Sequence, residues 1–171
     1  LCMLEEATGR HFFTSEESEP GAVSQPCEAP ESDENAAKFP LLLSCRQSPK
    51  GNNTPLFPTS LNLGFNDAVA ARALKLSNRP FFVLDCYRRF IQDYGIHILG
   101  IQMEKYCNIV DNLCKQWGIE SASQASVPQL RELVAEYKNI TPIPQDPFRQ
   151  VCAAIEAILR HHESLESSVY R

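Results

Sequence analysis

Apolar side chains recur at three- and four-residue steps through most of the second half of the chain, which predicts a series of amphipathic helices. Asn66 or Asp67 is a suitable N-cap for the first of them, which should continue through Leu76. Pro128 fits the first turn of a later helix, and Asp146-Pro147 should open the last one. The helices expected here cover residues 67–76, 81–94, 103–117 and 128–140, and a last helix that starts at residue 147 and contains residues 161 and 162.

The first third of the chain lacks this period. A short helix at the start should close near Gly9, because glycine suits a helix C-terminus. The apolar run at residues 39–46 predicts a buried strand that ends at Arg46, followed by a proline-rich loop over residues 47–60. The sequence therefore predicts an α+β fold that is mainly helical, with one or two early strands.

The same periods predict which helix faces are buried. In residues 81–94 the side chains of Phe82, Cys86, Phe90 and Tyr94 share one face, so we expect all four to face the core. The apolar side chains expected to line the last helix are Val151, Ile155, Ile158 and Leu159.

Charge is concentrated in one segment. Residues 14–37 contain seven of the 21 acidic residues and neither lysine nor arginine, and they are rich in serine, proline and alanine. Such a segment buries too little apolar surface to offset its ordering entropy, so we expect a disordered acidic insert there. The net charge of −5 gives no support for nucleic-acid binding. No apolar run is long enough for a membrane helix, so we expect no membrane partner.

Cysteine and histidine offer little catalytic or metal-binding pattern. The seven cysteines include no C-x-x-C pair, which favours reduced and mostly buried thiols, and zinc remains the sharper alternative. His97 lies among apolar neighbours, which favours core packing, and His161 and His162 should be solvated or weakly paired. We therefore expect no metal site and no catalytic residue within this chain.

Arg46 is the strongest candidate for ligand binding. It ends an apolar strand beside a long loop, and its guanidinium fork suits phosphate oxygens. A solvated or paired arginine is the plainer alternative. Arg88 and Arg89 could also hold an anion, although neighbouring helical residues point apart and at least one should be a salt-bridge partner. The residues alone thus indicate a mainly helical domain with one anion site.

A family resemblance rests on several sequence segments that occur in the same order as in the family: PLLLSCRQ, TSLNLGFND, DCYRRFIQDYG, QLRELVAEYK and PIPQDPFRQVCAAIEAIL. Together they resemble the N-terminal nucleotide-binding region of pyruvate, phosphate dikinase, which is an ATP-grasp region of the phosphoenolpyruvate/pyruvate-binding type. The resemblance covers nearly the whole chain except residues 14–37, and it identifies the chain as a divergent fragment. The closing Tyr170-Arg171 fits the next short motif of the family.

The resemblance implies that Arg46 contacts the phosphates of ATP. The family's glycine- and methionine-rich phosphate loop falls on the positions around residues 53–59, where Thr59 alone keeps its family identity. Thr59 is therefore the second candidate for phosphate binding. Pro55 replaces the loop glycine and Pro58 replaces its aspartate, and proline offers no N–H and cannot take a positive φ. Fold is expected to survive these changes better than phosphate binding.

By resemblance, the chain is the ATP-binding region of a phosphotransferase that passes phosphate from ATP to a histidine. Mg²⁺ would accompany ATP, and the partners would be ATP and the remaining domains of the parent enzyme. None of the four histidines matches the phosphorylated one, and the pyruvate domain is missing, so we expect no catalysis by this chain alone. Whether the intact protein is an enzyme stays open. The alternatives are a non-catalytic pseudoenzyme or regulatory module, and a partial gene product without independent function.

The resemblance also predicts the domain organisation. Residues 1–64 would form part of the nucleotide-holding lobe, residues 65–147 a helical subdomain, and residues 148–171 a helix returning to the main lobe. We expect the protein in the cytoplasm, or in an organelle reached through a targeting segment outside this sequence. The sequence starts at Leu1, so it is expected to be a piece of something longer.

Overall fold

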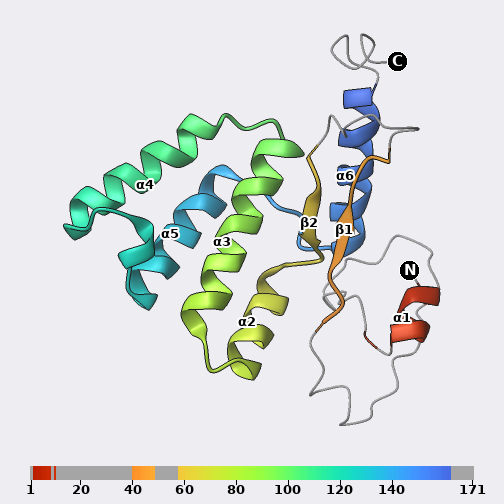
Figure 1. Cartoon of the computed structure of the whole chain (residues 1–171), viewed down its shortest axis with the longest axis horizontal. Helices are drawn as coiled ribbons and strands as arrows, with labels where there is room; N and C mark the ends of the chain where they lie inside the picture. Colours follow the sequence, from red (N-terminus) through yellow and green to blue (C-terminus); the bar gives the residue numbers. More distant parts are fainter. Residues whose placement is uncertain (1, 9, 11–39, 49–57, 163–171) are drawn as a thin grey trace.

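The structure is a computed structural model that describes residues 2–8, 10, 40–48 and 58–162. In Figure 1 helices α2 to α5 lie to the left of a two-stranded sheet, with α3 packed against β2, and α6 runs alongside the strands. The α+β prediction is confirmed. The elements, in chain order, are α1 (Cys2–Thr8), β1 (Leu43–Cys45), β2 (Ser60–Leu63), α2 (Asp67–Leu76), α3 (Pro80–His97), α4 (Met103–Trp117), the 3₁₀ turn η2 (Ala122–Gln124), α5 (Val127–Ile140) and α6 (Pro147–His162).

The predicted helix boundaries agree closely with the structure, because local capping signals set them. Asn66 is the N-cap of α2, and its Oδ1 accepts a hydrogen bond from the backbone N–H of Val69 at 2.8 Å. Pro128 lies in the first turn of α5, and the Gln129 side chain accepts a hydrogen bond from the backbone N–H of Ser126 at 2.7 Å. Gly118 ends α4 in the left-handed conformation.

The strands depart from the prediction. β1 is shorter than the expected 39–46, and β2 occupies residues that were assigned to the end of a loop and the approach to a helix. The two strands are antiparallel, with Leu43 opposite Leu63 and Cys45 opposite Ser60. β2 therefore holds one more residue than β1 between these pairs, a bulge at which Asn62 takes a positive φ of 59°. Pairing between distant segments leaves no local period in the sequence, so β2 was missed.

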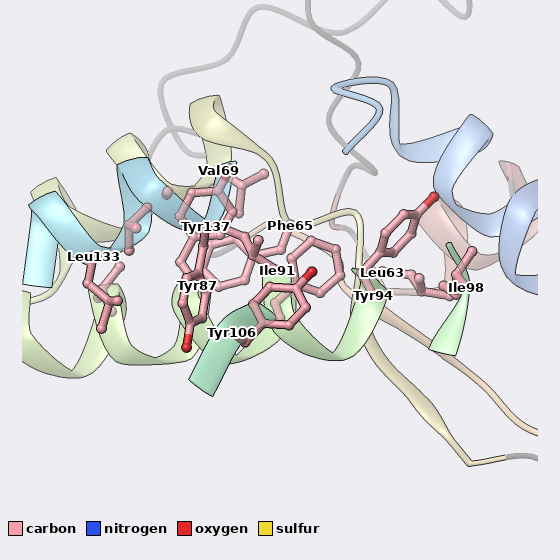
Figure 2. Close-up of a cluster of buried hydrophobic side chains, with 14 of the residues drawn as sticks. Leu63, Phe65, Val69, Tyr87, Ile91, Tyr94, Ile98, Tyr106, Leu133 and Tyr137 are labelled. Carbon is pink, nitrogen blue, oxygen red and sulfur yellow. The ribbon is translucent and has the colours of Figure 1, made fainter. Parts of the chain in front are cut away.

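One apolar core joins the helices to the sheet. Figure 2 shows Tyr87, Ile91 and Tyr94 of α3 beside Tyr106 of α4 and Tyr137 of α5, with Leu63 of β2 near Tyr94. Tyr106 and Tyr137 meet edge to face, with ring centroids 4.9 Å apart. The apolar side chains that share one face of α5, Leu130, Leu133, Val134 and Tyr137, lie in the interior.

Two predicted buried faces were partly wrong. On α3 the buried side is centred on Tyr87 and Ile91, so Phe82 is 62% exposed and Cys86 only half-buried, while Phe90 and Tyr94 are buried as expected. The cause is that α2 and α5 both pack on α3 and cover a broader, rotated face.

The second partly wrong face is that of α6, where Ile155 and Leu159 are 45% and 58% exposed. Ala154 and Ala157 face the interior instead, and their small side chains let the helix lie close to β1 and β2. None of the described helices is long and apolar enough to cross a membrane.

Gln150 fastens α6 to the end of β2. Its side chain is fully buried, its Oε1 accepts from the Gly64 N–H at 2.8 Å, and its Nε2 donates to the carbonyls of Phe65 and Pro144. A buried amide with three partners has nearly all of its hydrogen-bonding capacity satisfied. These hydrogen bonds therefore fix the segment between β2 and α2 relative to α6.

Candidate functional site

Arg46 and Thr59 come together at one end of the two-stranded sheet. Cys45, the last residue of β1, lies opposite Ser60, the first residue of β2. Arg46 directly follows Cys45 and Thr59 directly precedes Ser60, so antiparallel pairing sets the two side by side just beyond the ladder. The sequence predicted both residues separately, and the strand pairing brings them to one place.

The Arg46 side chain is free to meet a ligand. Arg46 is exposed and has no hydrogen-bond or salt-bridge partner among the described residues. Thr59 is exposed as well. An exposed guanidinium next to a hydroxyl offers charged and neutral donors to an anion such as phosphate.

The strand residues next to Arg46 and Thr59, which are Cys45 and Ser60, are less exposed to solvent than the pair itself. Burial raises the pKa of the Cys45 thiol, so the group beside Arg46 carries no negative charge at neutral pH. Ser60 is buried, and its Oγ has no hydrogen-bond partner in the described part of the chain. Arg46 therefore has no counter-charge from its strand neighbour Cys45. Pro58 is exposed, whereas Pro55 and the other loop positions at 49–57 lie outside the described residues.

Arg88 and Arg89, the other candidates for anion binding, form salt bridges within the fold instead. Arg88 and Arg89 both bind the carboxylate of Asp85, at 2.7 Å and 2.8 Å. Burial by itself would raise the pKa of Asp85, but the hydrogen bonds and charges of the two arginines outweigh it and lower that pKa. The expectation that at least one of these arginines is a salt-bridge partner is confirmed for both.

A further network was missed by sequence reasoning. Lys138 of α5 places its Nζ 2.6 Å and 2.7 Å from the two carboxylate oxygens of Asp67, and the Tyr87 hydroxyl donates to the same carboxylate at 2.8 Å. Burial, followed by the Asp67 carboxylate, raises the pKa of Tyr87. These groups satisfy one another and bind α2, α3 and α5 together. No sequence signal joins residues 71 positions apart, as Asp67 and Lys138 are.

The expectation of mostly buried thiols is wrong for the described cysteines. Cys114 is buried, Cys107 is exposed and the other three are half-buried, and all five thiols are free. Within the described ranges no group of three His, Cys, Asp or Glu side chains could hold a metal ion. The described residues therefore do not fit a resident Mg²⁺.

The chain was compared with known proteins. No protein-family model matches it. It is 30% identical over 149 residues to the pyruvate, phosphate dikinase of Clostridium symbiosum, which covers 80% of this chain and 17% of that protein. It is 34% identical over 138 residues to pyruvate, phosphate dikinase 2 of Zea mays, with 77% and 16% covered. For pyruvate, phosphate dikinase of Rickettsia prowazekii the identity is 30% over 137 residues, with 77% and 16% covered.

The resemblance to pyruvate, phosphate dikinase is confirmed. It holds for a divergent fragment, because the chain spans about a sixth of the length of these curated relatives. The sequence segments on which the resemblance rests lie in the elements that form the candidate site or pack against it. These are β1, the β2–α2 junction, α3, α5 and the start of α6.

Proposed function

We propose that this chain is part of the ATP-holding region of a pyruvate, phosphate dikinase-like phosphotransferase, in which Arg46 neutralises phosphate charge. The observation that carries the proposal is the exposed Arg46, without a partner among the described residues, set beside Thr59 at the end of the sheet. Kinship with the dikinases supplies the ligand class. In the intact protein the phosphate would pass from ATP to a histidine outside this chain.

Within this proposal the residues have distinct tasks. Arg46 offers two parallel N–H groups to phosphate oxygens, and the Thr59 hydroxyl donates one further hydrogen bond. Phosphoryl transfer depends mainly on positioning and charge stabilisation, so the fixed strand pair serves to orient these donors. Mg²⁺ would arrive with ATP. Pro55 and Pro58 remove backbone donors from the loop, so binding should be weaker than in a glycine-rich loop.

The exposed side of α6 supports a parent enzyme with further domains as partner. Phe148, Ile155 and Leu159 are 56%, 45% and 58% exposed and recur at steps of seven and four residues along one helix. A stripe of this kind is unusual on a finished surface. We propose that residues 1–64 and 148–171 belong to a larger nucleotide-holding lobe whose remaining parts cover this stripe, and that residues 65–147 form its helical subdomain.

The second candidate function is a non-catalytic pseudoenzyme or regulatory module, and the two loop prolines favour it. In that case the fold would be retained while ATP binding is weak or lost. Calorimetric titration with Mg-ATP separates the two candidates. Saturable binding that Arg46→Ala abolishes is the result expected for an ATP site.

Two further variants sharpen this experiment. Arg46→Lys keeps the charge but loses the two-pronged donor, so it should bind ATP more weakly than the original chain. Arg131→Ala removes an exposed arginine on α5, a helix that packs on α3 and α4, and should leave binding unchanged. Absence of binding at millimolar Mg-ATP by the original chain, with restoration by Pro55→Gly together with Pro58→Asp, would assign it to the non-catalytic class.

A further inference from the structure

The corner between α2 and α3, residues 75–82, differs from the rest of the surface in its charge. Residues 68–84 contain no aspartate or glutamate, whereas Arg72, Lys75 and Arg79 lie among them. α2 ends at Leu76 and α3 begins at Pro80, so the corner is a short connection at one end of the two packed helices (Figure 1). The connection is therefore positively charged.

Apolar side chains project from the same corner. Leu76 is 43% exposed, Phe81 is 37% exposed and Phe82 is 62% exposed. The core is complete without them, because Val83 and Leu84 of the same turn are buried. Three large apolar side chains within seven residues form a small apolar patch, and patches rimmed by polar residues mark interaction sites.

The acidic residues nearest in sequence cannot neutralise the corner. Asp67 is bound by Lys138, and Asp85 is bound by Arg88 and Arg89. Lys75 and Arg79 are exposed, and neither side chain has a hydrogen-bond or salt-bridge partner among the described residues. Arg72 has a partner and is left out of the argument. Two cations thus flank the patch without an internal counter-charge.

We propose that the α2–α3 corner is a docking surface for an acidic polypeptide segment. Phe81 and Phe82 would provide the apolar anchors, and Lys75 and Arg79 would pair with carboxylates at the rim. Aromatic anchors surrounded by a charged rim are the usual arrangement of an interface centre. Charge complementarity would then select an acidic partner and speed its association.

Two other occupants fit the corner less well. A second copy of this chain in a two-fold contact would bring Lys75 and Arg79 against the same cations of its partner, which is repulsive. A bilayer is held electrostatically by clusters of roughly four to eight basic residues, and this corner offers two unpaired ones. The inference does not rest on the proposed ATP site, since Arg46 lies at the sheet.

Fluorescence anisotropy with the full chain tests the proposal. The first probe is a labelled 16-residue peptide that repeats glutamate and leucine at helical spacing, and the second has lysine in place of every glutamate. The glutamate probe should bind and the lysine probe should not, and raising the salt from 50 to 500 mM should weaken binding at least fivefold. Equal binding of both probes would overturn the proposal.

Variants then locate the surface. Lys75→Glu with Arg79→Glu, and separately Phe82→Ser, should each weaken binding of the glutamate probe about tenfold or more. The matched controls are Arg160→Glu and Phe148→Ser, at an exposed arginine and an exposed phenylalanine of α6, which packs on the strands, and both should leave binding unchanged. All five substituted residues are exposed, and thermal melts check that each variant is folded. Loss of binding in the controls alone would refute the assignment.

Further arms distinguish the occupant. A peptide with the sequence of residues 14–37 carries seven carboxylates, and displacement of the glutamate probe by it would support an acidic segment supplied by this chain itself. Binding to phosphatidylserine vesicles without binding to the acidic peptides would overturn the proposal in favour of a membrane. Concentration-dependent dimerisation that Phe82→Ser removes, again without peptide binding, would overturn it in favour of self-association.

Discussion

Gly95 of α3 should not tolerate substitution by any residue that carries a Cβ atom. It lies near the end of the helix, and a Cβ built on it would overlap the hydroxyl of Tyr106 and come within 3.0 Å of both Tyr106 Cζ and Thr141 Cγ2. Tyr106 is fully buried, and its hydroxyl shares a hydrogen bond with Thr141 Oγ1. Gly95→Ala must therefore displace Tyr106, the side chain through which α4 packs on α3 and α5.

The expected cost follows from three contributions to the free energy of unfolding. Overpacking of a buried site costs about 1–3 kcal/mol. Breaking the buried hydrogen bond between Tyr106 and Thr141 costs about another 1–3 kcal/mol. Alanine gains about 1 kcal/mol over glycine in helix propensity. Because the two losses outweigh the gain, we expect Gly95→Ala to destabilise the chain by about 3 kcal/mol.

Urea denaturation followed by circular dichroism measures this change. With a slope of about 2 kcal/mol per molar urea, the midpoint should fall by about 1.5 M. The control is Gly95→Ala combined with Tyr106→Phe, which removes the overlapping oxygen but leaves the ring carbon close, so it should lose less stability than the sum of the two single variants. An unchanged or higher midpoint for Gly95→Ala would mean that helix propensity dominates and that this close packing is not present.

Three other variants follow from the buried polar groups. Tyr94→Phe should stabilise the chain, since the buried Tyr94 hydroxyl has no hydrogen-bond partner among the described residues and burial raises its pKa to about 12. For the original chain, this raised pKa means that stability is present below pH 10 and is lost as the pH rises towards 12. The loss should be smaller in melts of Tyr94→Phe, although it should not vanish, because burial also raises the pKa of Tyr87. Gln150→Leu should cost about 2–4 kcal/mol in urea denaturation, because it leaves the Gly64 N–H and two carbonyls without their buried partner; no loss would mean that water replaces the amide. The lowered pKa of Asp85 means that its ionised carboxylate stabilises the original chain at neutral pH, and that this stabilisation is lost as the pH falls below the usual pKa of aspartate. Asp85→Asn should lack this contribution to the free energy of unfolding at neutral pH. The melting temperatures of the two proteins should therefore converge in acid.

Helices could be predicted well because their signals are local. Asn66, Pro128 and Gly118 act on backbone groups within three or four residues of themselves, and each marks a helix boundary in the structure. The same cannot be said of β2, whose partner strand lies some 20 residues earlier across a loop. An isolated four-residue strand carries no period of its own, so only pairing with β1 defines it.

Buried faces were predicted less well because burial depends on which neighbours arrive. On α5 the apolar stripe and the buried stripe coincide, since one side of that helix meets α3 and α4. On α6 they diverge. The sheet selects the narrow side that carries Ala154 and Ala157 and leaves Ile155 and Leu159 outside. An apolar period shows which side of a helix is apolar. It does not show whether another element of the same chain packs against that side.

The candidate site shows the same division between local and long-range information. Arg46 could be singled out because it ends an apolar run, but its nearness to Thr59 requires the pairing of Cys45 with Ser60. Gln150 then holds the far end of β2, through the N–H of Gly64. The groups that fix this geometry are present in the chain, whereas the resemblance implies that Pro55 and Pro58 stand where the family's phosphate loop has glycine and aspartate.

That contrast has a physical consequence for the two proposed functions. Residues that hold the fold interact with one another, so losing any of them destabilises the chain whether or not it binds ATP. Loop glycines contribute to phosphate binding but little to folding, so they can be replaced at no cost to stability once tight binding is no longer needed. Arg46 is exposed and has no hydrogen-bond or salt-bridge partner among the described residues, so Arg46→Ala should leave the stability of the fold unchanged. Any change that this variant makes in ATP binding can therefore be assigned to the proposed site, and that response distinguishes the two proposed functions.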